Sequence, residues 1–262
     1  MITLSNDGVM ALAAELGVQT LPLVLAVGPQ QTTHAEWNAA QERARAEIRA
    51  ARLVDAHGDV TADAAESLFV LAQPDRELAA RIVTPDGLVR LCVARRGEAH
   101  AVAVRRDDRF TIQPLWTDGS GSSLARPILE LLGSCPPAEV VNFSATAAEL
   151  AERFDAAAAA ADYTNVFYAL GMNETDATAY GLALGSCHAH AEVVAYAYTD
   201  GVTERSPGAA VVYDTARGRI ASALGVAPDQ QLWSTLTPGT DHRIAQAITT
   251  LIESLPGRRW LP

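Results

Sequence analysis

A run of β-prone segments that ends in one amphipathic helix, residues 192–256, constrains the fold of this chain more than any other stretch. β-Branched and aromatic residues dominate four segments, residues 192–198, 209–214, 218–224 and 231–236. Turn sequences separate them, such as residues 214–218, which end in a glycine that accepts positive φ. After Thr240, a residue type that caps helices, apolar residues recur at helical steps: Ile244, Ala247, Ile248, Leu251 and Leu255. The stretch therefore predicts an antiparallel meander with a helix laid across it.

The preceding residues show a similar order of elements. A short helix over 6–16 and a strand over 20–27 come first, and a Thr33–Glu36 capping box opens a helix that runs to about residue 52. Thr61 precedes a second helix. Strands are predicted over residues 78–84, 88–94, 99–105 and 110–115. Ser122 or Ser123 then caps a helix that Gly133 closes.

The same order recurs after Pro137, which indicates an internal repeat. A strand over 139–144, a capping box at Thr146 and a helix cap at Asn173 or Thr175 lead into the meander. Thr33 and Thr146 lie about 113 residues apart. Thr61 and Thr175 lie about 114 residues apart, and the caps of the last helix in each half lie about 117 apart. We therefore expect residues 1–262 to form a single α+β domain with quasi-two-fold halves, about 20–133 and 138–256, each an antiparallel β-meander with helices.

Composition narrows the class of protein. Apolar residues make up 49% of the chain, which indicates a globular protein, and no apolar run reaches the length of a membrane span. The formal net charge of −11 disfavours nucleic acid as a partner. The first residues lack a basic leader, so a cytoplasmic location without membrane insertion is expected. The three cysteines are widely spaced and odd in number, which argues against a disulfide framework.

Motifs for chemistry are weak. Cys187, His188 and His190 lie close in sequence, but no fourth ligand is evident, so no metal is expected. Asp241 and His242 could form a hydrolase dyad with Ser234, yet no serine sits in a nucleophile elbow. No phosphate-binding loop is present in the sequence. We expect no catalytic residues and no cofactor. A hydrolase or other small-molecule enzyme, and a structural subunit that only self-associates, stay open as alternatives.

One polar insertion is a candidate binding element. The first meander has a tight turn at residues 85–87, whereas the second has residues 200–207 at the corresponding place. Polar loops on a rigid sheet often carry binding specificity, although a tolerated surface insertion is the alternative. The candidate residues are Thr203, Glu204, Arg205 and Ser206. Arg95 and Arg96, at a predicted hairpin tip, are secondary candidates.

Residues 212–220 and 231–248 together resemble the C-terminal signature of the EspG family, and residues 21–25 and 84–87 resemble its N-terminal features. The resemblance spans nearly the whole chain. It implies an α+β fold with quasi-two-fold symmetry and a cytosolic, non-enzymatic chaperone of an actinobacterial type VII (ESX) secretion system. Such a chaperone binds the helical tip of a PE–PPE heterodimer, on its PPE subunit, and keeps it soluble for secretion. No cofactor is implied, and a monomer or weak homodimer is expected. The six candidate residues would then form the grip on this partner.

Overall fold

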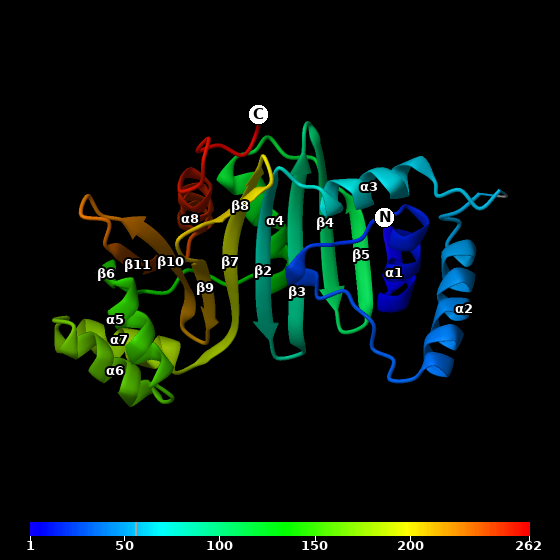
Figure 1. Ribbon diagram of the computed structural model, residues 1–262. Helices are drawn as coiled ribbons and strands as arrows, with labels where there is room; N and C mark the ends of the chain where they lie inside the picture. The colour runs from blue at the N-terminus through cyan, green and yellow to red at the C-terminus, as the bar shows by residue number, and fades with distance from the viewer. Residues whose placement is uncertain (56) are drawn as a thin grey trace.

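A single large antiparallel sheet organises the structure, a computed structural model that describes residues 1–55 and 57–262 (Figure 1). The strands follow one another across the sheet in this order: β1 (Ile2–Ser5), β5 (Arg109–Pro114), β4 (Ala99–Arg106), β3 (Gly87–Arg96), β2 (Arg76–Thr84), β7 (Cys187–Thr199), β9 (Ala210–Thr215), β10 (Gly218–Val226), β11 (Leu232–Pro238) and β6 (Phe143–Thr146). A further strand, β8 (Val202–Arg205), also pairs with β7. The predicted α+β class and both meanders are confirmed.

Helices cover the two faces of this sheet unequally. On one face, α4 (Gly121–Leu132) and α8 (Asp241–Glu253) pack together over the centre. On the other face, α1 (Asn6–Glu15), α2 (His34–Ala50) and α3 (Ala62–Ala72) lie over the first half. The helices α5 (Ala147–Asp155), α6 (Ala160–Ala169) and α7 (Glu174–Leu184) lie over the second half. Figure 1 shows these two groups at opposite ends of the sheet.

The central strands β2 and β7 show why this arrangement leaves an open face. Successive side chains of a strand point to opposite faces. Leu78, Ala80 and Ile82 point into the core beneath α4 and α8, together with the odd-numbered residues 191–197 of β7. The intervening side chains, such as Glu77 and Glu192, point to the face that α1–α3 and α5–α7 cover only at its two ends.

Several local predictions are confirmed. Thr33 and Glu36 form the predicted reciprocal capping box at the start of α2. Asn173 caps α7, and the Thr240 side chain accepts a hydrogen bond from the Arg243 amide at the start of α8. These signals depend only on neighbours within one helical turn, which explains why they can be read from sequence.

The predicted strand over residues 20–27 is wrong. The segment is a loop with one 3₁₀ turn, η1 (Leu23–Leu25), and Ala26 follows it with φ 49°. A left-handed residue cannot continue a strand, and side chains from the sheet bond the carbonyls of this segment, as described below. The apolar run thus reflects a buried Leu25 rather than strand pairing.

Other boundaries differ from the prediction. The strand β1 was not predicted, β6 begins four residues later than expected, and Ser120 rather than Ser122 or Ser123 caps α4. The helix expected from Thr146 to about Asp162 ends at Asp155 as α5, and the helical stretch expected to reach Leu170 is α6, which begins at Ala160. Trp233 on β11 is 36% exposed. The order of the strands is symmetric about the β2/β7 pair, so that β1 at one edge of the sheet corresponds to β6 at the other. The internal duplication stays an inference from this order.

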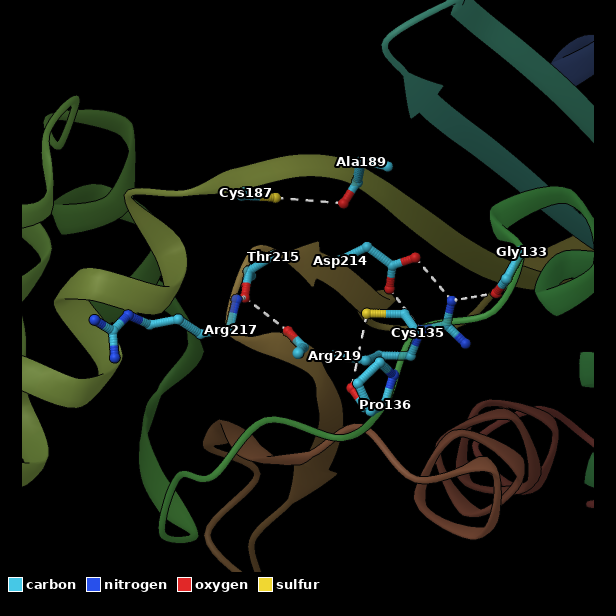
Figure 2. Close-up of polar contacts among 10 residues, drawn as sticks. Gly133, Cys135, Pro136, Cys187, Ala189, Asp214, Thr215, Arg217 and Arg219 are labelled. Carbon is cyan, nitrogen blue, oxygen red and sulfur yellow. Dashed lines mark hydrogen bonds and ion pairs between the residues drawn. The ribbon is translucent and has the colours of Figure 1, made fainter.

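Residues 212–220, part of the stretch that resembles the EspG family, bond the linker that follows α4 and leads to the second meander (Figure 2). Arg219 on β10 donates two hydrogen bonds to the Asp214 carboxylate on β9, at 2.5 and 2.7 Å, and a third to the carbonyl of Gly133 at 2.8 Å. Its backbone bonds Pro136 and Ala138 of the linker after α4. Both charged side chains are buried. The pair therefore ties the linker to the second meander.

Candidate binding groove

The uncovered centre of the sheet forms a groove of about 860 Å³. Side chains of β2 and β7 make its floor: Glu77, Ala79, Arg81, Glu192, Val194, Tyr196 and Tyr198. One wall consists of residues 20–24 together with the end of α3 and the residues after it, 71–74. Thr203 and Arg205 of β8, with Ala209, make the opposite wall. The groove therefore joins residues that lie up to 189 positions apart in the chain.

The predicted loop over residues 200–207 is instead a hairpin extension, and this part of the prediction is wrong. Asp200 and Gly201 both have positive φ, 51° and 79°, and they join Thr199 to Val202 as a two-residue turn. Such turns match the twist of antiparallel strands, and Asp-Gly is a favoured pair for them. The polar residues that follow pair with the end of β7.

Strand pairing separates the four predicted binding residues of this segment. Thr203 lies opposite Tyr198, and Arg205 lies opposite Tyr196. Residues directly opposite in an antiparallel pair share a face, so Thr203 and Arg205 line the groove. Glu204 lies opposite the buried Ala197 and faces the other side of the sheet.

Ser206 is buried and has a structural role. Its hydroxyl donates to the carbonyl of Gly208 at 2.7 Å and accepts from the amide of Ala195 at 3.1 Å. Its own amide donates to the Ala195 carbonyl at 2.8 Å. The side chain thus replaces a missing ladder bond where the chain passes from β8 to β9, and it is not available to a partner.

The structure separates Arg95 and Arg96 from the groove. Arg95 is only 6% exposed, where a hairpin tip in water was expected. Its guanidinium donates to the Gly97 carbonyl at 3.0 Å and lies 3.6 Å from the Asp75 carboxylate. This residue faces the α4/α8 side of the sheet, because it follows the alternation of Leu91 and Val93. Arg96 is exposed but does not line the groove.

One carboxyl group lies at the groove floor with very little exposure. The Tyr198 hydroxyl donates to the Glu77 carboxylate at 2.7 Å. Burial raises the pKa of the Glu77 carboxyl, and the hydrogen bond from Tyr198 partly opposes this rise. Burial also raises the pKa of the Tyr198 hydroxyl. The two groups therefore form a fixed polar point within an otherwise aromatic and aliphatic floor.

Arginines form a row across the groove side of the first meander. Arg81 lies opposite Arg90, and Arg90 lies opposite Arg105 on the next strand. On its other side Arg81 faces Glu192 of β7. Burial together with the charges of Arg81 and Arg105 lowers the pKa of the Arg90 guanidinium. Like charges directly opposite destabilise a sheet, so this row needs compensating acceptors.

Sequence reasoning missed most of the groove floor. Glu77, Tyr196, Tyr198 and the segment before α2 were not proposed as site residues. The alternation of polar or aromatic with small apolar residues in β7 is the signal that points to a one-sided strand. This alternation does not indicate which part of the sheet face the helices α1–α3 and α5–α7 leave uncovered.

The residues described as lining the groove do not form a serine or cysteine nucleophile with a histidine base. Serine, cysteine and histidine are missing from the described residues that line it. Cys187 donates to the Ala189 carbonyl (Figure 2), and no group of three potential metal ligands occurs within residues 1–55 and 57–262. Of the helices described, none has the length and hydropathy that a bilayer crossing requires.

Comparison with known proteins gives consistent matches over nearly the whole chain. The model of the EspG family matches residues 5–250. The chain is 28% identical to the ESX-1 secretion-associated protein EspG1 of Mycobacterium tuberculosis, over 99% of this chain and 89% of the relative. It is also 28% identical to the ESX-3 secretion-associated protein EspG3 of Mycolicibacterium smegmatis, over 100% of this chain and 89% of that relative.

A solved structure shares the fold. It is the Mycobacterium tuberculosis type VII secretion system chaperone EspG5 in complex with the PE25–PPE41 dimer. The TM-score is 0.80 at 22% identity, and the alignment covers 99% of this chain and 98% of that one. The predicted α+β class is therefore confirmed by an independent structure.

Proposed function

The chain belongs to the EspG family, and we propose that it is a chaperone of a type VII (ESX) secretion system that binds a PE–PPE heterodimer. In this role it covers the tip of the PPE subunit in the cytoplasm and keeps the pair soluble until secretion. The relatives EspG1 and EspG3 are secretion-associated proteins of the ESX-1 and ESX-3 systems, which supports the secretion system, and the complex of EspG5 with the PE25–PPE41 dimer supports the class of partner.

The single observation that carries the binding role is the open sheet face between the two groups of helices. It offers apolar and aromatic side chains, including Val194, Tyr196 and Tyr198, in a groove on a rigid sheet. Exposed apolar surface that is rimmed by polar residues is typical of protein-binding sites. Aromatic residues with a polar end are also enriched at such interfaces. A client that hides its own apolar tip in this groove would lose its tendency to aggregate.

Thr203 and Arg205 are the proposed rim of this grip. Arg205 carries a guanidinium that can make two parallel hydrogen bonds to a carboxylate or to backbone carbonyls of a helical tip. Glu204 faces away and Ser206 supports the hairpin, so neither belongs to the grip. Arg95 and Arg96 also lie outside it.

A non-enzymatic role fits the groove better than the alternative of a hydrolase. In the groove floor, the Tyr198 hydroxyl donates to the Glu77 carboxylate, so these two groups bond each other. The groove lies on the uncovered centre of the sheet, between the two groups of helices. We propose a one-to-one complex with the heterodimer and no cofactor.

Co-expression with the PE–PPE pairs of the same genome, followed by affinity capture and gel filtration, tests the proposal. We expect one complex to co-elute at the mass of three chains. Arg205→Glu should lower the affinity by at least about 30-fold, which corresponds to the usual hot-spot threshold of about 2 kcal/mol.

Arg217→Glu is the matched control, because Arg217 is an exposed arginine on the β9–β10 turn outside the groove. It should bind like the wild type. Failure of the wild-type chain to capture any PE–PPE pair would contradict the function. Equal affinity of Arg205→Glu and wild type would remove β8 from the grip.

A further inference from the structure

Leu23, at the rim of the groove, is exposed to an unusual degree. Its side chain is 94% exposed, whereas Leu25, two residues later, is 1% exposed within the core of the first half. Single exposed leucines are common on protein surfaces and need no explanation by themselves. Leu23 differs from such residues because hydrogen bonds and core contacts fix the 3₁₀ turn that carries it.

Backbone bonds, a core side chain and the Asn6 amide hold this turn. The amides of Leu25 and Ala26 bond the carbonyls of Pro22 and Leu23, both at 3.0 Å, to form the 3₁₀ turn. Leu25 anchors it in the core. The buried Asn6 side chain bonds both the amide and the carbonyl of Gly28, just beyond the turn.

Two arginines from the sheet complete this support. Arg90 donates to the carbonyl of Val24 at 3.1 Å. Arg105 donates to the carbonyl of Leu25 at 2.9 Å and also to that of Ala26. These carbonyls are the acceptors that the row of like charges requires, so the row and the turn are parts of one arrangement. Arg105 is further held over the ring of Phe110, 5.1 Å from its centroid.

The turn is continuous with the groove. Leu21, Pro22, Leu23 and Val24 form one wall, and the aromatic floor of β7 lies beside them. An exposed apolar side chain on a turn that is already ordered loses little conformational freedom when it binds, which favours affinity. Leu23 can therefore anchor a partner at the edge of the groove at a low cost in conformational entropy.

We infer that Leu23 is a preorganised apolar anchor that packs against apolar side chains of the client, and that Arg90 and Arg105 are positioning residues for its turn. The inference rests on the proposed function, because the client it names is the PE–PPE heterodimer. It adds a specificity element on the wall opposite Arg205.

The test measures the affinity of the purified chain for its cognate PE–PPE pair by titration calorimetry. Leu23→Asp should lower the affinity by at least about 30-fold, the hot-spot range, and Leu23→Ala should lower it less. The melting temperature should stay within about 2 °C of wild type, because the side chain is exposed. Val226→Asp, at another exposed apolar residue on the far end of β10, is the control and should bind normally.

Arg105→Met tests the positioning role. It should weaken binding and speed hydrogen exchange of the amides of residues 25 and 26, since it removes two bonds to their turn. In the Leu23→Asp background, Arg105→Met should cause no further loss of affinity, because the anchor is already gone. Additive losses would overturn the positioning role. Unchanged affinity of Leu23→Asp would overturn the anchor while wild-type binding still supports the chaperone, whereas failure of the wild type to bind would overturn the proposed function itself.

Discussion

At the scale of single residues, burial of the Asp214–Arg219 pair has a desolvation cost and a gain from hydrogen bonding between the two charges. Removing both charges from water is costly, and the cost is offset only when geometry and further hydrogen bonds are favourable. Here the two groups meet through two short bonds, and Gly133 provides a third acceptor for the guanidinium. The hydrogen bonds to Asp214 raise the pKa of Arg219. The pair thereby connects the two halves at the linker.

Breaking this pair should be strongly destabilising. Arg219→Met leaves the Asp214 carboxylate buried without its partner, which should lower the free energy of unfolding by about 3–5 kcal/mol. Urea denaturation followed by circular dichroism measures this change. Arg217→Met, at an exposed arginine two residues away, should stay within about 0.5 kcal/mol of wild type. A loss below about 1 kcal/mol for Arg219→Met would contradict the structural role.

At the scale of elements, the β7–β8 hairpin shows how a polar stretch becomes the wall of a binding site. The left-handed turn at Asp200 and Gly201 reverses the chain, and the bonds of Ser206 bridge the irregularity before β9. Because the hairpin extends past the regular pairing of the sheet, few contacts hold β8 besides β7. Its position therefore depends on these local bonds.

Ser206→Ala should loosen this wall. The amide of Ala195, which is buried, would lose its acceptor, at a cost of about 1–3 kcal/mol in unfolding free energy. Amide hydrogen exchange should quicken at Ala195 and along residues 202–205, whereas β2 should keep its protection. Ser144→Ala is a suitable control, since the hydroxyl of this exposed serine bonds the Thr235 hydroxyl at the sheet edge. Unchanged exchange of β8 would show that the hydroxyl does not set the hairpin.

At the scale of the whole molecule, the β2/β7 pair joins the two halves into one sheet. Eight residue pairs connect the strands, from Arg76 opposite Ala197 to Val83 opposite His190. The core beneath α4 and α8 draws on both halves, with Leu78 from the first and Ile248 from the second. Each half alone would expose this shared core and one long strand edge.

The chain should therefore unfold as one cooperative unit. Thermal unfolding followed by far-ultraviolet circular dichroism and by tryptophan fluorescence should give coincident transitions. Expressed alone, residues 1–133 should show the poorly dispersed amide spectrum of a chain without fixed packing. Two separated transitions, or a well-dispersed spectrum of that fragment, would contradict the shared core.

The sequence by itself determined the local structure of the chain, namely its helix starts, its tight turns and most of its strands. The helix caps, the turn sequences and the alternation of the meander strands depend on residues within a few positions, so they predicted most helices and strands. The family resemblance, which rests on a long C-terminal block, was confirmed by the matching family model and by the shared fold. The two groove residues found in advance, Thr203 and Arg205, came from comparing the two halves.

Tertiary structure alone decided which surface stays open. Whether residues 20–27 form a strand or a turn depends on Arg90 and Arg105, which lie 66 and 80 positions away from the carbonyls that they bond. Whether Arg95 is exposed depends on which face of β3 the helices cover. The groove exists because β2 pairs with β7, an association between residues more than 100 positions apart. Such pairing is selected by the burial of a common core, a property of the folded chain that no local pattern contains.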